Sequence, residues 1–287
     1  MMNIGFIGTG VMGKSMAGHL KGHTLFVFNR TKEKADTLIE QGAVWCRSPA
    51  EVSEQCDVIF TMLGYPHDVE EMYLGEQGLV KCGRPGQFLI DCTTSSPELA
   101  KKIAEEAMAA GISVIDAPVS GGDIGAKNGT LSVMTGGDEQ AYLKVREILN
   151  MFSSSVQYFG QAGSGQHTKM ANQIAIASGM IGVAESLYYA EQAGLDIERV
   201  LETISKGAAG SWSLSNLAPR MLAGDYQPGF YTHHFLKDMK IALDEASKMN
   251  IQLPGLELAY QLYNQLSEEQ KQSTGTHIIF ERYRGNN

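Results

Sequence analysis

The sequence predicts an α/β domain with a mostly parallel, doubly wound sheet, followed by an all-α domain. Up to about residue 160, short apolar runs alternate with amphipathic stretches, which is the order of βαβ units. Beyond that point no convincing strand is found, and apolar residues recur at helical spacing from Met170 to Tyr188. The glycine-rich segment 160–165 marks the change. We therefore expect domains at 1–162 and 163–287.

The order of the elements follows from these patterns. Strands are expected at Asn3–Ile7, Thr24–Phe28, Val58–Met62, Phe88–Ile90, Ser113–Ile115, Thr130–Thr135 and Val156–Phe159. Helices are expected between them, one ending near Leu20 and one at Thr31–Glu40. In the second half a long first helix is followed by helices at Ile197–Ser205, His234–Met249 and Gly255–Leu266. The end, Arg282–Asn287, is expected to be loosely held.

Composition and charge exclude several classes of protein. Hydrophobic residues make up 43% and charged residues 19% of the 287, which is typical of a globular chain. The formal charge of −9 argues against nucleic acid or an anionic membrane as a partner. The four cysteines lack CxxC and zinc spacing, so reduced thiols and no metal site are expected. The longest apolar run, Met170–Ala184, is too short and too polar to span a membrane, so we expect a cytoplasmic protein.

A glycine-rich turn follows the first predicted strand and opens a helix. Its residues are Gly8, Thr9, Gly10, Val11, Met12 and Gly13, which match the pattern GxGxxG. In this context the first glycine allows the tight turn, the second lets the backbone approach a pyrophosphate, and the third lets the helix pack on the strand. The helix N-terminus then holds the anion. The sequence therefore predicts a dinucleotide site.

The end of the second strand indicates which dinucleotide binds. No acid follows the strand; the residues there are Asn29, Arg30 and Thr31. An acid would bond the ribose 2′-OH of NAD, whereas Arg30 can bind a 2′-phosphate in bidentate fashion, with hydrogen bonds from Asn29 and Thr31. We expect NADP to be favoured, with NAD also possible.

Two further segments carry candidate chemistry. Ser120, Gly121 and Gly122 follow a predicted strand, and their hydroxyl and amide groups could hold a carboxylate. Lys169 lies near the start of the long helix, where the dipole disfavours positive charge, so it is a candidate general acid or base. Asn172 and Gln173 share its helix face.

The predicted helical domain offers two more candidates. Lys237 and Asp238 form a charged site on an amphipathic helix. Trp212, in a break rich in Gly and Ser, is a candidate for the substrate pocket.

Five motifs together resemble the β-hydroxyacid dehydrogenase family. They are GFIGTGVMGKSMAGHL, DCTTSSP, DAPVSGG, GSGQHTKMANQ and FLKDMKIAL, in order between Ile4 and about Glu245. The family includes 3-hydroxyisobutyrate dehydrogenase, tartronate semialdehyde reductase and glyoxylate/succinic semialdehyde reductase. The resemblance implies a Rossmann domain, a long interdomain helix and an all-helical C-terminal domain. It also implies hydride transfer between NAD(P)(H) and a short β-hydroxyacid or semialdehyde acid in a homodimer or homotetramer.

The resemblance also implies a role for each candidate residue. Lys169 matches the lysine that gives a proton to the carbonyl oxygen in reduction and takes it back in oxidation. Asn172 matches the polar residue three positions after it. Some relatives place this residue one position later, where this chain has Gln173, so the assisting role stays divided between the two.

The remaining matches concern the substrate and the cofactor. Ser120, Gly121 and Gly122 match the loop that binds the substrate carboxylate, and Asp238 is expected at the substrate. Thr94 and Lys237 match contacts to the nicotinamide half, and Met62 and Leu63 match the loop beneath the ribose and pyrophosphate. The family often has a proline directly after this loop, whereas this chain has Gly64-Tyr65-Pro66. That departure puts the path of the loop in question.

Two other classes are considered beside this one. Imine reductases share the architecture but usually have an acid or a tyrosine in place of the lysine. A non-catalytic NADPH-binding module would have lost the lysine. Lys169 and the intact DAPVSGG segment argue against an imine reductase, and Lys169, Ser120 and Asn172 argue against a non-catalytic module.

Overall fold

The computed structural model describes residues 1–285, and the chain divides into two units. The first comprises Met1–Lys169, and the second begins at Met170. The predicted domains meet at 162/163, and the last two residues of the predicted range, Asn286 and Asn287, lie outside the described part.

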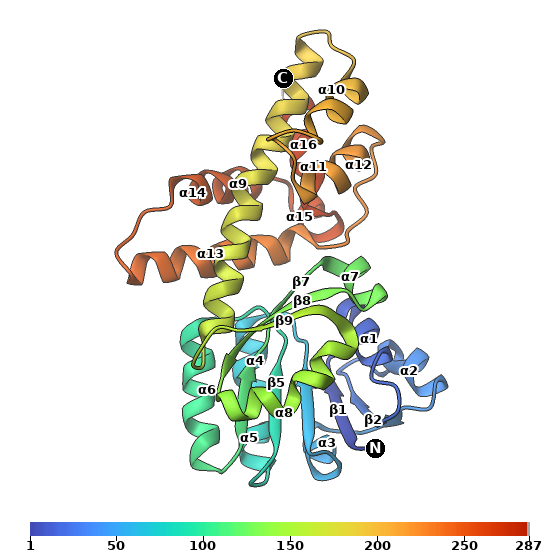
Figure 1. The fold of residues 1–287 in the computed structure, drawn as a ribbon, viewed down its shortest axis with the longest axis vertical. Helices are drawn as coiled ribbons and strands as arrows, with labels where there is room; N and C mark the ends of the chain where they lie inside the picture. Colours follow the sequence, from blue (N-terminus) through green and yellow to red (C-terminus); the bar gives the residue numbers. More distant parts are fainter. Residues whose placement is uncertain (286–287) are drawn as a thin grey trace. The chain divides into compact units, whose positions relative to one another are not determined.

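The first unit is an α/β unit with helices on both faces of a sheet (Figure 1). Its strands are β1 (Asn3–Ile7), β2 (Thr24–Phe28), β3 (Val44–Trp45), β4 (Val58–Thr61), β5 (Phe88–Asp91), β6 (Ser113–Asp116), β7 (Val119–Ser120), β8 (Leu131–Gly137) and β9 (Ser153–Tyr158). Its helices are α1 (Val11–Gly18), α2 (Asp36–Glu40), α3 (Pro49–Gln55), α4 (Pro66–Leu74), α5 (Leu79–Cys82), α6 (Pro97–Ala109), α7 (Gly122–Asn128) and α8 (Glu139–Leu149), with 3₁₀ turns η1 (Lys32–Ala35) and η2 (Asn150–Phe152).

The strand order defines where ligands bind. Within the described residues the order is β3-β2-β1-β4-β5-β6-β8-β7, with β9 paired to β8. The strands from β3 to β6 are parallel, and β8 runs antiparallel to β6 and β7. The chain moves outward from β1 to β3 and then returns to β4 on the other side of β1. The carboxyl ends of β1 and β4 therefore form the switch point at which such sheets bind ligands. The predicted mostly parallel, doubly wound fold is confirmed.

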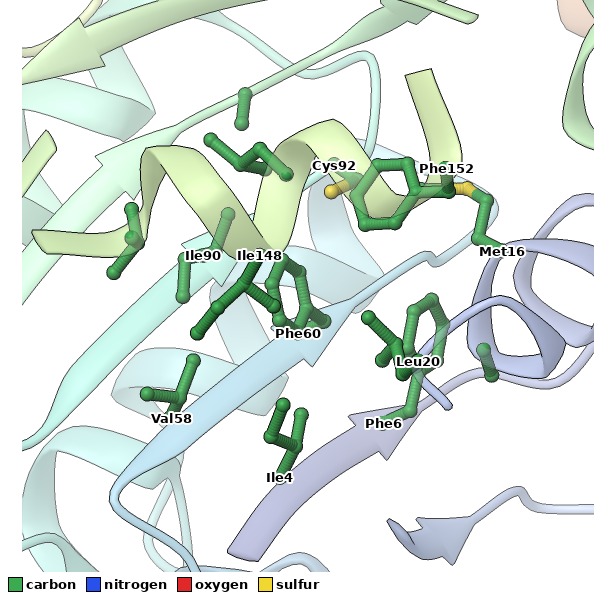
Figure 2. Close-up of a cluster of buried hydrophobic side chains, with 14 of the residues drawn as sticks. Ile4, Phe6, Met16, Leu20, Val58, Phe60, Ile90, Cys92, Ile148 and Phe152 are labelled. Carbon is green, nitrogen blue, oxygen red and sulfur yellow. The ribbon is translucent and has the colours of Figure 1, made fainter. Parts of the chain in front are cut away.

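Alternating side chains along the strands supply a core on each face of the sheet. Ile4 and Phe6 of β1 pack with α1, α2 and α8, whereas Ile7, one position on, packs with α3, α4, α5 and α6. Figure 2 shows the first core, in which Leu20 lies beside Phe6 and Ile148 beside Phe60. The strands are buried on both faces because crossover helices cover both, so the apolar runs are nearly continuous.

The second unit is helical, apart from an isolated β-bridge between Tyr231 and Gly275 in the described residues. Its helices are α10 (Ile197–Ile204), α11 (Trp212–Asn216), α12 (Ala218–Leu222), α13 (Thr232–Lys248), α14 (Pro254–Asn264), α15 (Glu268–Ser273) and α16 (Ile279–Arg284), with a 3₁₀ turn η3 (Thr276–Ile278). The long helix α9 (Ser164–Gln192) begins in the first unit and continues into the second. A buried T-shaped pair, Phe235 and Tyr263, with ring centroids 5.3 Å apart, ties α13 to α14.

Some predicted elements differ from the structure. The helix expected at Thr31–Glu40 is split into η1 and α2. The two-residue strands β3 and β7 were not predicted, because two residues carry no periodicity. The prediction that the C-terminal end is loosely held was wrong for residues 282–284. Helix α16 continues to Arg284, and the Arg284 guanidinium pairs with Glu191.

Candidate active site

The glycine turn has the geometry that a pyrophosphate site needs. Gly8 has φ 93°, and a Cβ there would lie 2.2 Å from the Met62 carbonyl oxygen. A Cβ at Gly13 would lie 1.9 Å from the Gly8 carbonyl oxygen, so α1 packs directly on the turn. A Cβ at Gly10 would meet nothing within 4 Å. The fold itself therefore requires Gly8 and Gly13, whereas Gly10 leaves open space in front of the N-terminus of α1, which suits a phosphate.

The residues after β2 lie against this turn. The Thr9 N–H donates to Asn29 Oδ1 at 3.0 Å, and Asn29 Nδ2 donates to the Thr31 carbonyl oxygen at 2.8 Å. The Asn29 side chain therefore connects the glycine turn to the segment after β2, a role that the sequence did not reveal. The Arg30 side chain is 82% exposed, and its guanidinium lies 3.1 Å from Asp68 Oδ1. Arg30 thus presents a cationic group at the edge of the sheet.

The unusual segment Gly64-Tyr65-Pro66 forms the entry to α4. Tyr65 is the N-cap residue and Pro66 the first helical residue, where the missing N–H of proline is tolerated. Asp68, in the first turn, accepts the Tyr65 N–H at 3.1 Å. The proline therefore starts the helix rather than shaping the loop after Leu63. Met62 remains against the glycine turn, as described above.

The loop after β5 is fixed on both sides of Thr94. Thr93 Oγ1 accepts the Leu63 N–H at 2.8 Å, and the Thr93 N–H donates to Asp91 Oδ1 at 3.0 Å. The Ser95 N–H donates to Gln166 Oε1 at 2.9 Å. The loop beneath the predicted nicotinamide contact is thus bonded both to the β4 end and to the start of α9.

Lys169 lies on α9, three residues after Gln166 and so about one helical turn further along. It is 6% exposed, which is rare for a lysine. Asp116, the last residue of β6, accepts the N–H groups of Gly163 and Gln166 at 2.8 and 2.9 Å. The segment that carries Lys169 is therefore anchored to the carboxyl edge of the sheet.

The predicted carboxylate loop lies at this same edge. Ser120 belongs to β7, opposite Ser132 of β8, instead of a plain glycine turn. Gly121 and Gly122 follow with φ values of 127° and 63°, which glycine adopts readily. The candidate residues of the first unit therefore lie along the carboxyl edge of the sheet, after β1, β2, β4, β5 and β7 and at the start of α9.

In the second unit, four predicted residues form one connected group. Gln173 Oε1 accepts from Asn172 Nδ2 at 2.8 Å, and Gln173 Nε2 donates to Asp238 Oδ2 at 2.6 Å. The other Asp238 oxygen lies 3.1 Å from Lys237 Nζ. Gln173 and Asp238 are both buried. Both polar atoms of the Gln173 amide are thus bonded within this group, and Asn172 lies at its end.

Other predicted features have clear positions. Trp212 is the first residue of α11 and is 59% exposed, so its place in a pocket stays a prediction. Within residues 1–285 no group of three His, Cys, Asp or Glu side chains could hold a metal ion. None of the helices described is long and apolar enough to cross a membrane.

The sequence assigned no role to a buried polar group beneath the site. Asp91, at the end of β5, accepts Thr61 Oγ1 at 2.8 Å as well as the Thr93 N–H, and Thr61 Oγ1 also bonds the Tyr73 hydroxyl at 2.9 Å. Burial raises the pKa of Asp91 to about 6, although the hydrogen bonds oppose this. Aspartate at a buried strand end was the available signal in DCTTSSP.

A glycine turn at the switch point, with an open position at Gly10, defines the class as a dinucleotide-binding protein, and the buried lysine at the same edge is a candidate proton donor. Comparison with known proteins agrees. Residues 3–160 match the family model described as the NAD binding domain of 6-phosphogluconate dehydrogenase. Residues 163–283 match the one described as NAD-binding of NADP-dependent 3-hydroxyisobutyrate dehydrogenase.

Individual relatives cover nearly the whole chain. An uncharacterized oxidoreductase, YkwC, of Bacillus subtilis is 55% identical over 96% of this chain and 97% of its own length. The 2-hydroxy-3-oxopropionate reductase of Escherichia coli is 37% identical over 92% and 90%. The structure of a Mycobacterium tuberculosis 3-hydroxyisobutyrate dehydrogenase with L-serine has a TM-score of 0.90 at 28% identity, covering 99% of both chains. An imine reductase from Pseudomonas sp. shares the fold alone, with a TM-score of 0.65 at 16% identity.

The chain therefore belongs to the β-hydroxyacid dehydrogenase family, among the 3-hydroxyisobutyrate dehydrogenase-like oxidoreductases. The resemblance stated from the five motifs is confirmed.

Proposed function

We propose that the protein transfers a hydride between NADP(H) and a short β-hydroxyacid or semialdehyde acid, with Lys169 as the general acid and base. The burial of Lys169 carries this proposal, since a lysine with 6% exposure at the ligand-binding edge of the sheet is suited to proton transfer. The family descriptions and the named relatives support the same class of substrate.

The reaction needs three groups from the chain. The substrate carboxylate is held by the Ser120 hydroxyl and the amides of Gly121 and Gly122. The bound nicotinamide supplies the hydride to the carbonyl carbon in reduction. Lys169 gives a proton to the carbonyl oxygen as negative charge develops there, and takes it back in oxidation. Asn172 assists Lys169, since both polar atoms of the Gln173 amide are already bonded, to Asn172 and Asp238.

The preference for NADP rests on Arg30. Its guanidinium is exposed at the end of β2, where an acid would select NAD, and it can bind a 2′-phosphate at two oxygens. Thr31 is exposed beside it. The Asn29 side chain is bonded to the Thr9 N–H and to the Thr31 carbonyl oxygen, so it supports the turn that faces the phosphate.

Other parts of the proposal come from the sequence and the family. Thr94 and Lys237 contact the nicotinamide half, Asp238 faces the substrate, and Met62 and Leu63 lie beneath the ribose and pyrophosphate. The protein acts in the cytoplasm as a homodimer or homotetramer, with a small carboxylate as its substrate.

The substitution Lys169→Ala tests the assignment. We expect turnover to fall by about 10²- to 10⁴-fold, the usual contribution of a general acid or base, with cofactor affinity within about threefold of the wild type. The exposed Lys102 offers a matched control, and Lys102→Ala should leave turnover unchanged. Wild-type turnover in Lys169→Ala would show that another group moves the proton.

A screen with NADPH and NADH in parallel identifies the substrate. The absorbance of the reduced nicotinamide measures each reaction. The reductive panel contains succinic semialdehyde, glyoxylate, methylmalonate semialdehyde and tartronate semialdehyde. The oxidative panel contains 3-hydroxyisobutyrate, 3-hydroxypropionate and L-serine. Tight NADPH binding without turnover on any of them would favour the non-catalytic module instead.

A further inference from the structure

The start of α9 is bonded to a carboxylate from another part of the fold. Asp116 is buried at the end of β6, and its two oxygens accept the N–H groups of Gly163 and Gln166 at 2.8 and 2.9 Å. Helix α9 has no acid in its own first turn. Asp116 therefore supplies the negative charge that the positive end of this 29-residue helix favours.

Close backbone packing fixes the position of this turn. A Cβ at Gly165 would lie 2.4 Å from the Met134 carbonyl oxygen and 2.6 Å from the Asp116 carbonyl oxygen. A Cβ at Gly136 would lie 2.7 Å from Asp116 Oδ1 and from the Gly165 nitrogen. The ends of β6 and β8 and the start of α9 thus meet without room for side chains, so the helix start cannot slide along the sheet.

The Gln166 side chain joins this turn to the loop after β5. It is fully buried, its Oε1 accepts the Ser95 N–H at 2.9 Å, and its Nε2 donates to the Thr93 carbonyl oxygen at 2.8 Å. Both bonds flank Thr94, the residue expected at the nicotinamide. Thr93 in turn holds the Leu63 N–H at 2.8 Å, so the bonds continue to the β4 end.

We propose that Asp116 and Gln166 are positioning residues that hold the proton donor and the nicotinamide loop in one fixed arrangement. Lys169 follows Gln166 by three residues and lies on the same side of α9, about one turn along the helix. A shift of the first turn therefore moves the lysine amine relative to Thr94. The inference rests on the proposed role of Lys169 as proton donor.

The substitution Gln166→Leu tests the inference because it removes both side-chain bonds and keeps a similar volume. A displacement of about 1 Å in a reacting group can lower turnover by about 10²-fold, and we expect a loss of that order in kcat. Cofactor affinity should stay within about threefold, since the glycine turn and Arg30 are untouched. The primary isotope effect on kcat, measured with cofactor deuterated at the transferred position, should rise because hydride transfer becomes rate-limiting.

Gln87→Leu is the matched control for loss of buried hydrogen bonds. Gln87 is also buried, at the opposite end of the same sheet, and its Nε2 donates to the Ser53 and Cys56 carbonyl oxygens at 2.7 and 2.8 Å. Both Leu variants should lower Tm, because each leaves buried polar groups unpaired. Only Gln166→Leu should lower kcat and raise the isotope effect.

The possible results separate this inference from the proposed function. If Lys169→Ala is inactive while Gln166→Leu keeps the wild-type kcat and isotope effect, the positioning role is overturned. If Lys169→Ala keeps its turnover, the proposed function fails first and the positioning role fails with it. Should Gln166→Leu not fold, Gln166→Glu decides, since it keeps an acceptor for the Ser95 N–H and loses the donor to Thr93. A wild-type kcat in that variant would also overturn the proposal.

Discussion

Replacing Asp91 by Asn should change how the stability of the first unit depends on pH. The carboxyl group is buried at the end of β5, and burial raises its pKa from 3.8 to about 6. The hydrogen bonds from Thr61 Oγ1 and from the Thr93 N–H end on Oδ1, and the Thr93 hydroxyl is a third hydrogen-bond partner of this carboxyl group. Asparagine retains Oδ1, so the variant removes the titration and keeps the first two bonds.

The direction follows from the proton balance. Below about pH 3 the carboxyl group is protonated in the folded and the unfolded chain, so the free energy of unfolding does not change with its titration. Between about pH 4 and 6 the folded chain holds a proton that the unfolded chain has lost, so stability falls as pH rises. Above about pH 6 both states are ionised and the loss is complete. From pH 4.5 to 7.5 the expected loss is about 2 kcal/mol.

Urea unfolding measures this loss at a series of pH values. Trp45 lies on β3 in the first unit, and the substitution Trp212→Phe removes the other tryptophan, so fluorescence then reports that unit. The difference in unfolding free energy between the parent and Asp91→Asn should decrease by about 2 kcal/mol from pH 4.5 to 7.5. The other carboxyl groups are common to both proteins, so their contributions cancel apart from the coupling between Asp91 and Asp116. Parallel pH curves would refute the argument that this buried carboxyl group titrates with a raised pKa.

Two further predictions concern the cofactor site. Gly10→Ala should fold with nearly wild-type stability, because its Cβ meets nothing in the protein, yet raise the cofactor KM at least about tenfold. Gly13→Ala should lower the free energy of unfolding by roughly 1–3 kcal/mol, since its Cβ collides with the backbone. Equal Tm values for Gly10→Ala and Gly13→Ala would contradict this expected difference. Asp68→Asn should raise the NADPH preference in kcat/KM about two- to fivefold, because Asp68 no longer competes with the phosphate for Arg30. An unchanged or lower preference would indicate that Asp68 instead orients Arg30.

The parts of the fold with repeated local signals could be predicted from the sequence. The early strands were correct because each is an apolar run between turn residues, and β1 and β2 match their predicted bounds. The helices α3 and α6 begin with a serine cap followed by proline, at Ser48 and Ser96. The split of η1 and α2 follows no such signal: Ala35 and Leu38, one in each element, are both buried in the same core.

The candidate site was predictable where one motif holds its residues together. The glycine turn is a local feature, and its three glycines have distinct surroundings that the pattern anticipated. The bond between Gln173 and Asp238 joins residues 65 positions apart, so local spacing could not reveal it. Asp116 and Gln166 were visible within DAPVSGG and GSGQHTKMANQ, but their function depends on a contact across 50 residues. The side chains of Asp116 and Gln166 are both buried, which their residue types do not predict.

The side chain of Asn29 limits how the nucleotide preference of this enzyme can be changed. The usual way to favour NAD is to place an acid at the end of the second strand. Here an aspartate at that position would still accept the Thr9 N–H, but its second oxygen would face the Thr31 carbonyl oxygen that Asn29 Nδ2 now bonds at 2.8 Å. The resulting repulsion would reshape the glycine turn as well as the ribose end. To shift the preference of this chain towards NAD, the contacts to the adenosine and to the pyrophosphate must therefore be redesigned together.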